Sequence, residues 1–348
     1  MLASRIEIGL EWGRRWTEGI LNSENSLIDV AAVFAREYGN TILPVNYVRG
    51  VPISGRLRLA KILDDEDRVV SEIEKLIDPV VNQFDIDSIR FLDGSVHSGY
   101  LWAHDLTELT AEKKYMDLMV TVADLYLADD NPIDADNRVE DIFFVGALMG
   151  RAYNFSKREI YANFLFKYLE QVNPQSDSNL WWHSNSSPYY WGRGNAFAAL
   201  GFAEALSFLP TTETDFQKSV TKHRAHLDAL ISYQHESGAW SQVINNSDTY
   251  LELTSTAILG YVLARGIRGG WLSQDYSLYL EKAWIGITNY IDSNGQVRNA
   301  CAGTGPLSTL LEYIQRPTVE GHDDRSGGFV LWFAVEYACL LMKKPFNN

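Results

Sequence analysis

Two aspartates occur in settings where burial could raise the pKa of a carboxyl group toward neutral pH. Asp141 begins the almost uncharged segment DIFFVGALMG, and Asp93 lies in FLDGSVH, directly before Gly94. When two carboxyl groups face one pocket, one of them is kept protonated, as a general acid requires. A structural role is an equally simple explanation. Asp141 could cap a helix, as the neighbouring Glu140 could, and Asp93 could stabilise a turn.

An arginine between two glycines marks a second candidate site. Arg193 lies in YYWGRGNAFAALGFAEAL, flanked by Gly192 and Gly194 where a helix is expected to begin. The glycines let the backbone approach a ligand closely, and the start of a helix favours a negative charge. Because the guanidinium fork suits a carboxylate, we expect Arg193 to bind an anion. The alternative is a buried ion pair between Arg193 and an internal Asp or Glu.

Aromatic residues are frequent in polar, glycine-rich segments. The chain has 10 Trp, 18 Tyr and 15 Phe. Sugar-binding sites stack pyranose rings on such side chains, although a large core could use the same rings as filler. Residues 238–257 and 316–329 also have the composition of pocket walls. In the second segment, Asp323, Asp324 and Arg325 could form no more than an internal salt-bridge network.

Composition excludes several classes of function. The chain of 348 residues carries a net charge of −15 and no basic run, which argues against nucleic acid or an anionic membrane as a partner. Cys301 and Cys339 form no CxxC motif, and none of the seven His lies in HExxH. There is also no GxSxG motif and no phosphate-binding glycine loop. We therefore expect acid–base chemistry without a metal or a cofactor.

The chain lacks the sequence signs of membrane insertion or export. No apolar stretch approaches the roughly 18 residues that a membrane crossing needs. The N-terminal segment MLASRIEIGLEWGRRW has scattered charges and no apolar signal core. We expect a cytoplasmic protein, with a secretory leader removed before this N-terminus as the alternative.

The elements that must position these residues are helices. Apolar residues recur at helical spacing after Ser156, which forms a capping-box pattern with Glu159. Alternating, strand-like runs are short and rare, so the pattern predicts an all-α protein of roughly a dozen helices. The predicted helices cover residues 7–20, 27–38, 73–84, 111–127, 141–153, 156–172, 195–208, 212–231, 252–265, 278–291, 309–314 and 326–342.

The connections between helices repeat. Leu180 in NLWWH and Ala239 in GAWSQV are 59 residues apart, and Ala239 is 57 residues before Gln296 in GQVRN. This period divides the chain into about six helical hairpins, which must bury their inner faces on one another. The last helix, GGFVLWFAVEYACLLM, is apolar nearly all round, so a closed toroid fits better than an open solenoid. No linker interrupts the chain, and we expect one domain over residues 1–348.

Several of these strings together resemble one family. WGRGNAF (Trp191–Phe197) is similar to the WGRGNGW signature of the unsaturated rhamnogalacturonyl hydrolases, glycoside hydrolase family 105, which are related to the unsaturated glucuronyl hydrolases. GAWSQV, YLELTSTAILGYVLARGIRGGWL, GTGPL and GHDDRSGGFVLWFAVEY resemble its later signatures, and EDIFFVGALMG resembles the segment that carries its catalytic Asp. The resemblance extends from about Asp93 to the C-terminus and implies an (α/α)6 barrel.

The resemblance also implies an activity. The substrate would be a small anionic oligosaccharide with a 4,5-unsaturated uronic acid at its non-reducing end, such as an unsaturated rhamnogalacturonan disaccharide. Asp141 would protonate C4 as a general acid and then activate the water that adds at C5. Asp93 would orient sugar hydroxyls and help to keep Asp141 protonated. Arg193 would hold the uronate carboxylate, and His183 in NLWWH would hydrogen-bond near the double bond.

Three aromatic residues, Trp191, Phe197 and Trp240, would form walls on which the sugar stacks. Phe197 stands where the family usually has a second Trp in its signature. Val139 lacks the aromatic side chain often found two residues before the catalytic Asp, and Phe144 replaces a frequent Met. These departures affect the sugar-stacking walls, so they leave the identity of the substrate more open than the type of reaction.

Two other functions remain open from the sequence. A sugar epimerase or isomerase on the same toroid would need paired histidines, and His183 with His322 is the one pair that we would offer. A non-catalytic carbohydrate-binding toroid would need no acid, so Asp141→Asn would leave its ligand affinity unchanged.

Overall fold

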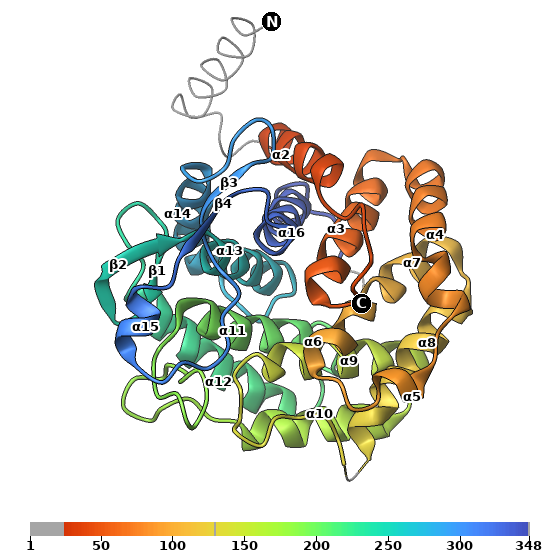
Figure 1. Cartoon of the computed structure of the whole chain (residues 1–348), viewed down its shortest axis with the longest axis horizontal. Coiled ribbons are helices and arrows are strands. Elements are labelled where there is room, and N and C mark those ends of the chain that lie inside the picture. The colour runs from red at the N-terminus through yellow and green to blue at the C-terminus, as the bar shows by residue number, and fades with distance from the viewer. Residues whose placement is uncertain (1–23, 129, 347–348) are drawn as a thin grey trace, which may run out of the picture.

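The computed structural model describes residues 24–128 and 130–346, whose long helices form two concentric layers (Figure 1). The inner layer contains α3 (Tyr47–Leu63), α7 (Trp102–Thr110), α9 (Asp141–Ser156), α11 (Gly192–Leu206), α13 (Leu253–Arg268) and α16 (Asp324–Leu341). The outer layer contains α2 (Glu24–Glu37), α4 (Glu66–Asn82), α8 (Lys113–Asp124), α10 (Glu159–Gln171), α12 (Thr214–Ile231) and α14 (Ser277–Thr288). The predicted (α/α)6 barrel is therefore confirmed. The predicted helix over residues 7–20 lies outside the described residues.

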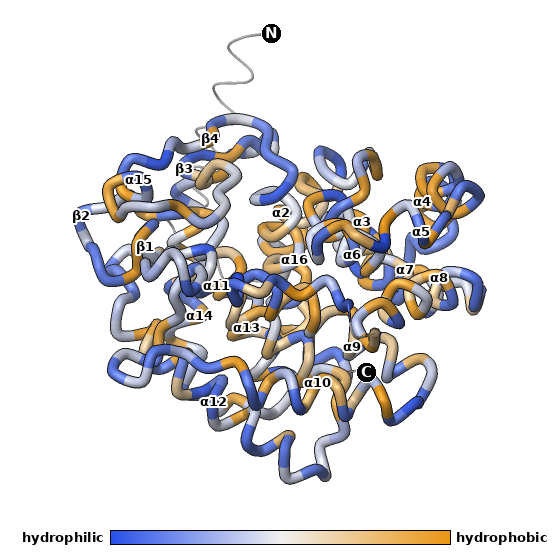
Figure 2. The backbone as a smooth tube through the Cα atoms, turned by 60° about the horizontal axis from the view of Figure 1, so that its bottom comes forward, coloured by the Kyte–Doolittle hydropathy of each residue, from blue (hydrophilic) through white to orange (hydrophobic). Residues whose placement is uncertain are grey.

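The two layers differ in burial as their sequences require. Every residue of α11 is buried, because an inner helix contacts neighbours on both sides and an outer helix behind it. In α4, by contrast, the buried residues are Val69, Ile73, Ile77 and Val80, which follow the three- and four-residue spacing of a single apolar face. Figure 2 shows the same division, with hydrophobic stretches along α13 and α16 and hydrophilic loops around them.

Two inner helices that carry candidate site residues pack unusually closely. A Cβ atom added to Gly146 of α9 would lie 2.3 Å from the carbonyl oxygen of Gly201 in α11. One added to Gly201 would lie 2.2 Å from the carbonyl oxygen of Ile142. The backbones of α9 and α11 thus touch, and this contact sets the distance between their N-terminal ends.

The inner helices α3 and α7 were not predicted from the sequence. The segment YVRGVPISGRL of α3 contains Gly50, Pro52 and Gly55, which normally disfavour a helix interior. In the barrel, these glycines permit close packing. A Cβ at Gly50 would lie 2.6 Å from the carbonyl oxygen of Gly99, and one at Gly55 would lie 2.7 Å from the side chain of Leu331. Tertiary packing here overrides the local helix propensity.

Short elements connect the long helices. Two antiparallel pairs of strands form from the repeated connections, β1 (Trp240–Val243) with β2 (Asn246–Glu252) and β3 (Val297–Cys301) with β4 (Thr318–Gly321). The short helices are α5 (Ile86–Ile89), α6 (Gly94–His97), η2 (Ser98–Tyr100), η3 (Leu125–Leu127), η4 (Gln274–Tyr276) and α15 (Leu310–Ile314). Because β2 runs directly into α13 and β4 almost directly into α16, the strands lie at the end of the barrel where the inner helices begin.

None of the described helices combines the length and the apolar composition that a membrane crossing requires.

Candidate active site

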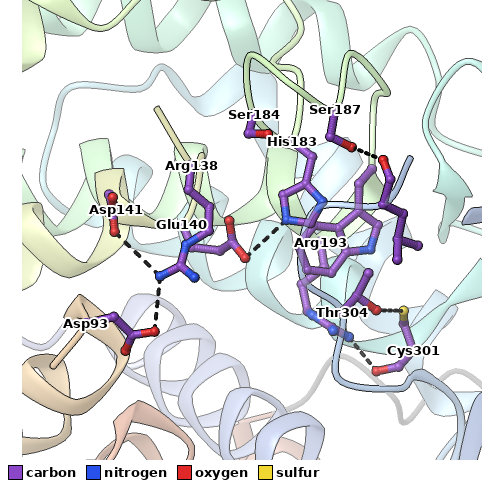
Figure 3. A network of polar contacts seen from close by, with 12 residues as sticks. Asp93, Arg138, Glu140, Asp141, His183, Ser184, Ser187, Arg193, Cys301 and Thr304 are labelled. Carbon is purple, nitrogen blue, oxygen red and sulfur yellow. Dashed lines mark hydrogen bonds and ion pairs between the residues drawn. The ribbon is translucent and has the colours of Figure 1, made fainter. Parts of the chain in front are cut away.

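Most of the predicted site residues gather at the end of the barrel where the inner helices begin (Figure 3). Asp141 is the first residue of α9, and Arg193 is the second residue of α11. Asp93 directly precedes the short helix α6, and His183 lies in the connection between α10 and α11. Residues that are up to 100 positions apart in the sequence are thus brought into one polar cluster by the barrel.

Asp141 is a buried carboxyl group with a raised pKa. Its side chain is 4% exposed, and its Oδ2 accepts a hydrogen bond from the backbone N–H of Asp134 at 2.8 Å. Burial raises the pKa of Asp141 from 3.8 to about 7, although the hydrogen bond from Asp134 and the charge of Arg138 act in the opposite direction. A substantial fraction of this carboxyl group is therefore protonated at neutral pH.

Arg138, which the sequence analysis missed, lies between the two predicted aspartates. Its Nη2 is 3.3 Å from Oδ2 of Asp93 and 4.0 Å from Oδ1 of Asp141. The two carboxylates are therefore closer than the screening length of about 10 Å at 0.1 M salt. Asp93 also caps α6 by accepting the N–H of Ser95, and its side chain is 52% exposed. Arg138 precedes Asp141 by three residues, and this closeness in the sequence was the available signal.

Glu140 and His183 form a second buried pair. His183 is completely buried, and its Nε2 lies 3.3 Å from Oε1 of Glu140. Its Nδ1 lies 2.5 Å from the hydroxyl of Tyr313, which in turn lies 2.7 Å from Oγ of Ser187. Of these residues, only His183 was predicted from the sequence. Glu140 has the sequence signal of a helix cap alone, and Tyr313 is 130 residues from His183.

Arg193 is held by backbone carbonyl groups. It is 1% exposed, and it donates hydrogen bonds to the carbonyl oxygens of Cys301 at 2.5 Å and Ala302 at 2.9 Å. Its guanidinium carbon lies 4.7 Å from the centre of the Trp191 ring. No acidic side chain among the described residues forms an ion pair with Arg193, so the expected alternative of an internal Asp or Glu partner is not observed. Its role in binding a substrate carboxylate stays a prediction.

The three predicted stacking walls are packed within the protein. Trp191, Phe197 and Trp240 are each 1% exposed. Phe197 stacks on Phe143 with ring centres 5.6 Å apart, and Nε1 of Trp240 donates a hydrogen bond to the carbonyl oxygen of Leu230 at 2.7 Å. None of the three presents a free ring face to a sugar, because the barrel core uses their surfaces. This corrects the expectation for these residues. Trp191 instead supports the side chains of Arg193 and His183.

The three charged residues Asp323, Asp324 and Arg325 make separate contacts and do not form a salt-bridge network with one another among the described residues. Asp323 caps the helix by accepting the N–H of Ser326, and Asp324 forms an ion pair with Arg49. Nε of Arg325 donates a hydrogen bond to the hydroxyl of Tyr47 at 2.9 Å.

His322 does not join the His183 cluster. It is half exposed, its ring stacks on Tyr38, and its Nε2 is 3.5 Å from Asp324. The structure therefore places no second histidine opposite His183, within the described residues, for the epimerase alternative.

A cavity of about 230 Å³ opens on one side of the cluster. Its lining includes Asp141, Arg138 and Trp182, but not Glu140, His183 or Arg193. Asp141 and Glu140 are adjacent in the sequence, and only Asp141 borders this cavity.

One group of potential metal ligands occurs among the described residues, toward the other end of the barrel. It contains His104, Asp105 and Glu108 of α7. The oxygens of Asp105 are already bonded to Arg58 at 2.9 Å and Ser54 at 2.5 Å, and burial lowers the pKa of His104 to about 3. Because its carboxylate is already bonded in this way, Asp105 belongs to an ion-pair network with Arg58. The expectation of no metal or cofactor stays a prediction.

Comparison with known proteins gives a matching family model and a curated relative. The family model described as Glycosyl Hydrolase Family 88 matches residues 45–341. The unsaturated rhamnogalacturonyl hydrolase YesR of Bacillus subtilis (strain 168) is 28% identical over 190 residues, which are 51% of this chain and 53% of that protein. The match thus spans about half the length of this curated relative. The resemblance found in the sequence is confirmed at the level of the family.

Solved structures share the fold. A possible member of the GH105 family from Salmonella enterica subsp. enterica serovar Paratyphi A has a TM-score of 0.77 at 17% identity, with 91% of this chain and 94% of that chain covered. The unsaturated glucuronyl hydrolase of Bacillus sp. GL1 has a TM-score of 0.63 at 12% identity, with 94% and 96% covered. At such identities the likeness supports the α/α barrel and nothing further.

Proposed function

The chain belongs to Glycosyl Hydrolase Family 88, and on this basis we propose that it removes a 4,5-unsaturated uronic acid from the non-reducing end of a small oligosaccharide. Such sugars are the products of polysaccharide lyases, and an unsaturated rhamnogalacturonan disaccharide is the substrate that the resemblance favours. The name of the relative YesR, an unsaturated rhamnogalacturonyl hydrolase, supports this substrate class.

The reaction is an addition of water to the C4=C5 double bond. This bond is an enol ether, so a proton added at C4 leaves an oxocarbenium-like centre at C5. A water molecule then adds at C5, and the resulting hemiketal opens and releases the remaining sugar. The protein must supply one carboxyl group that first donates a proton and then accepts one from water.

Two features of the site support this proposal. One is the pair of buried carboxyl groups at the start of α9, and the other is Arg193, which forms no ion pair with an acidic side chain among the described residues. Glu140 and Asp141 are both buried at the start of α9, and burial raises the pKa of Asp141 to about 7. Arg193 is a buried cation, and burying an uncompensated charge is costly. A bound uronate carboxylate would supply the missing negative charge.

The overall charge does not prevent an anion from binding here. The net charge of −15 repels an anionic sugar at long range, but salt screens such charges over about 8 Å. Within that distance, Arg138 and Arg193 line the cluster (Figure 3). The proposal also includes a single catalytic domain, a cytoplasmic location and activity without a cofactor.

The test is an assay of the purified protein with a panel of lyase products from different polysaccharides. We expect the ultraviolet absorbance of the C4=C5 bond to disappear with at least one unsaturated disaccharide, and the saturated sugar to accumulate in equal amount. Saturated disaccharides of the same composition serve as the control. If no unsaturated product is consumed, the proposed function is wrong.

A further inference from the structure

Glu140 and Asp141, adjacent at the start of α9, point in different directions. Glu140 already has helical dihedral angles, φ −64° and ψ −25°, so successive side chains from Glu140 onward rotate by about 100°. Glu140 therefore shares its direction with Phe144, four residues later. The ring of Phe144 contacts Tyr47 of α3, with ring centres 5.6 Å apart, so this direction faces the inner helices across the barrel axis. Asp141 is rotated by about 100° from Glu140 around the helix axis.

The contacts of Asp141 agree with this orientation. Burial first, and then the charge of Asp141, raises the pKa of both Tyr126 and Tyr168, which belong to η3 and α10. The side chain of Asp141 thus lies near the outer layer of the barrel. In Figure 3, Arg138 lies between Asp141 and Glu140, and Glu140 is on the side of His183. Asp141, the predicted proton donor, is therefore on the opposite side of Arg138 from His183 and Arg193, whereas Asp93 is on the same side as Asp141.

The two carboxyl groups also differ in their free hydrogen-bonding capacity. Oδ2 of Asp141 is satisfied by the N–H of Asp134, and Oδ1 lies near Arg138. Oε1 of Glu140 contacts His183, whereas Oε2 of Glu140 is buried without a hydrogen-bond partner among the described residues. Buried carboxylate oxygens are nearly always bonded, because leaving one unpaired is costly. Oε2 of Glu140 is thus the oxygen in this pair whose hydrogen-bonding capacity is not used by any of the described residues.

The orientation of His183 toward Glu140 is fixed by its other contacts. Tyr313 contacts its Nδ1, and the hydroxyl of Tyr313 is itself fixed by Ser187 and by the N–H of Leu307 at 3.1 Å. The imidazole cannot turn without breaking these contacts. Its Nε2 therefore stays directed at Oε1 of Glu140, and Oε2 takes no part in this contact.

We propose that Glu140, rather than Asp141, is the carboxyl group that exchanges protons with the substrate, and that Asp141 is a positioning residue that acts through Arg138. This inference rests on the proposed function and assigns its proton donor. In the first step, the O–H bond of Glu140 breaks and a C4–H bond forms with the electron pair of the C4=C5 bond. In the second step, water forms the O–C5 bond and gives its proton to Glu140. The carboxyl group is regenerated, and one water molecule is consumed.

The test compares the isosteric variants Glu140→Gln and Asp141→Asn on a lyase product that the wild type consumes. Glu140→Gln is expected to lower kcat by about 10²–10⁴-fold with little change in KM, because a positioned proton donor is lost. Asp141→Asn removes a contact to Arg138 and is expected to cost less than about tenfold. Thermal unfolding of both variants establishes that they are folded. If Asp141→Asn loses as much kcat as Glu140→Gln, or more, the assignment is wrong.

Chemical rescue provides a second measurement that a structural role would not affect. In Glu140→Ala, added formate can enter the space of the missing carboxyl group and is expected to restore part of kcat. In Asp141→Ala, formate is expected to have no effect, because that group does not reach the reacting carbons. Rescue of Asp141→Ala alone overturns the assignment. A wild-type protein that consumes no lyase product refutes the proposed function, and the assignment with it, whereas an active wild type with an equally active Glu140→Gln refutes only the assignment.

Discussion

At the residue scale, one arginine of the candidate site contacts two aspartates that differ in burial. Arg138 joins Asp93, which is half exposed, to Asp141, which is buried. Arg138 lowers the pKa of Asp141, so it cannot be the reason that this pKa is raised. Burial is the cause, and the expectation that Asp93 keeps Asp141 protonated stays a prediction.

The raised pKa of Asp141 predicts a pH-dependent stability. The folded protein binds this proton more tightly than the unfolded chain, so the contribution is present below about pH 4 and is lost as the pH rises through about 7. Between these values, the free energy of unfolding of the wild type should fall relative to that of Asp141→Asn, by up to about 4 kcal/mol. Urea unfolding at pH 4.5 and 8 measures this, with Asp117→Asn at an exposed position of α8 as a control. Parallel pH profiles of wild type and Asp141→Asn would contradict the raised pKa.

Arg193 is predicted to recognise the carboxylate of the substrate. Arg193→Lys keeps the charge but loses the guanidinium fork and the stacking on Trp191, so KM should rise by an amount equivalent to about 1–3 kcal/mol. The decisive comparison uses a substrate methyl-esterified at that carboxylate. The wild type should strongly prefer the acid, whereas Arg193→Ala should treat acid and ester nearly alike.

An exposed arginine, Arg158 at the start of α10, provides the matched control, because Arg158→Ala should keep the wild-type preference. If Arg193→Ala discriminates as well as the wild type, Arg193 has a structural role through Cys301 and Ala302. The carboxylate would then have to be bound elsewhere, with Arg325 as the next candidate.

At the element scale, the contact between α9 and α11 sets the distance from Glu140 and Asp141 to Arg193. Gly201 allows this contact because a Cβ atom there would meet the backbone of Ile142, which cannot move as a side chain can. The helices that carry the proton donor and the cation therefore depend on a glycine that lies about two turns from Arg193 and contacts the backbone of Ile142, the residue after Asp141.

Gly201→Ala is predicted to destabilise the protein. At an open helix position, this change would stabilise by about 1 kcal/mol through helix propensity. Here the helices must separate, and overpacking of this kind costs about 1–3 kcal/mol or more. Denaturant unfolding measures the change, and kcat should fall together with stability. Gly305→Ala, where an added Cβ would have no neighbour within 4 Å, should change stability by less than about 0.5 kcal/mol. Equal stability of the two variants would contradict the close contact.

At the scale of the whole molecule, the two ends of the barrel have different tasks. The end at which the inner helices begin holds the candidate site, where Arg193 is held by backbone carbonyl groups. Toward the other end, charged side chains form ion pairs between neighbouring inner helices. Arg151 of α9 is 2.6 Å from Glu204 of α11, and Tyr261 of α13 donates a hydrogen bond to the same carboxylate at 2.6 Å.

Glu204→Gln is predicted to lower stability without removing the chemistry. The side chains of Arg151 and Glu204 are 0% and 1% exposed, so the loss of one partner leaves a buried charge and costs about 3–5 kcal/mol. Thermal unfolding should show this loss, while kcat per folded molecule at low temperature should stay near the wild-type value. Glu108 pairs with Lys61, and its side chain is more exposed than that of Glu204. Glu108→Gln should therefore cost less than about 1 kcal/mol. A large loss of kcat in folded Glu204→Gln would show that the two ends are coupled.

The sequence alone determined the class of the fold and the neighbourhood of the site. Helical periodicity, a repeat of nearly 60 residues and an apolar last helix were sufficient for a closed toroid, because these patterns are local or periodic. The helix α3 was not predicted, because Gly50 and Pro52 disfavour a helix locally. The barrel tolerates these residues through contacts with distant segments. The motif around Arg193 and the carboxyl-bearing start of α9 were also visible, because they combine residue types that packing alone does not explain.

Only the tertiary structure decided what each of these side chains can do. The indoles of Trp191 and Trp240 look like sugar platforms in the sequence, but the core covers them. Glu140 and Asp141 are neighbours in the chain, yet Glu140 contacts His183, whereas Asp141 lies near Tyr126 and Tyr168 of the outer layer. Tyr313 reaches His183 across 130 residues. Direction, burial and long-range contact are properties of the assembled barrel, and no local pattern encodes them.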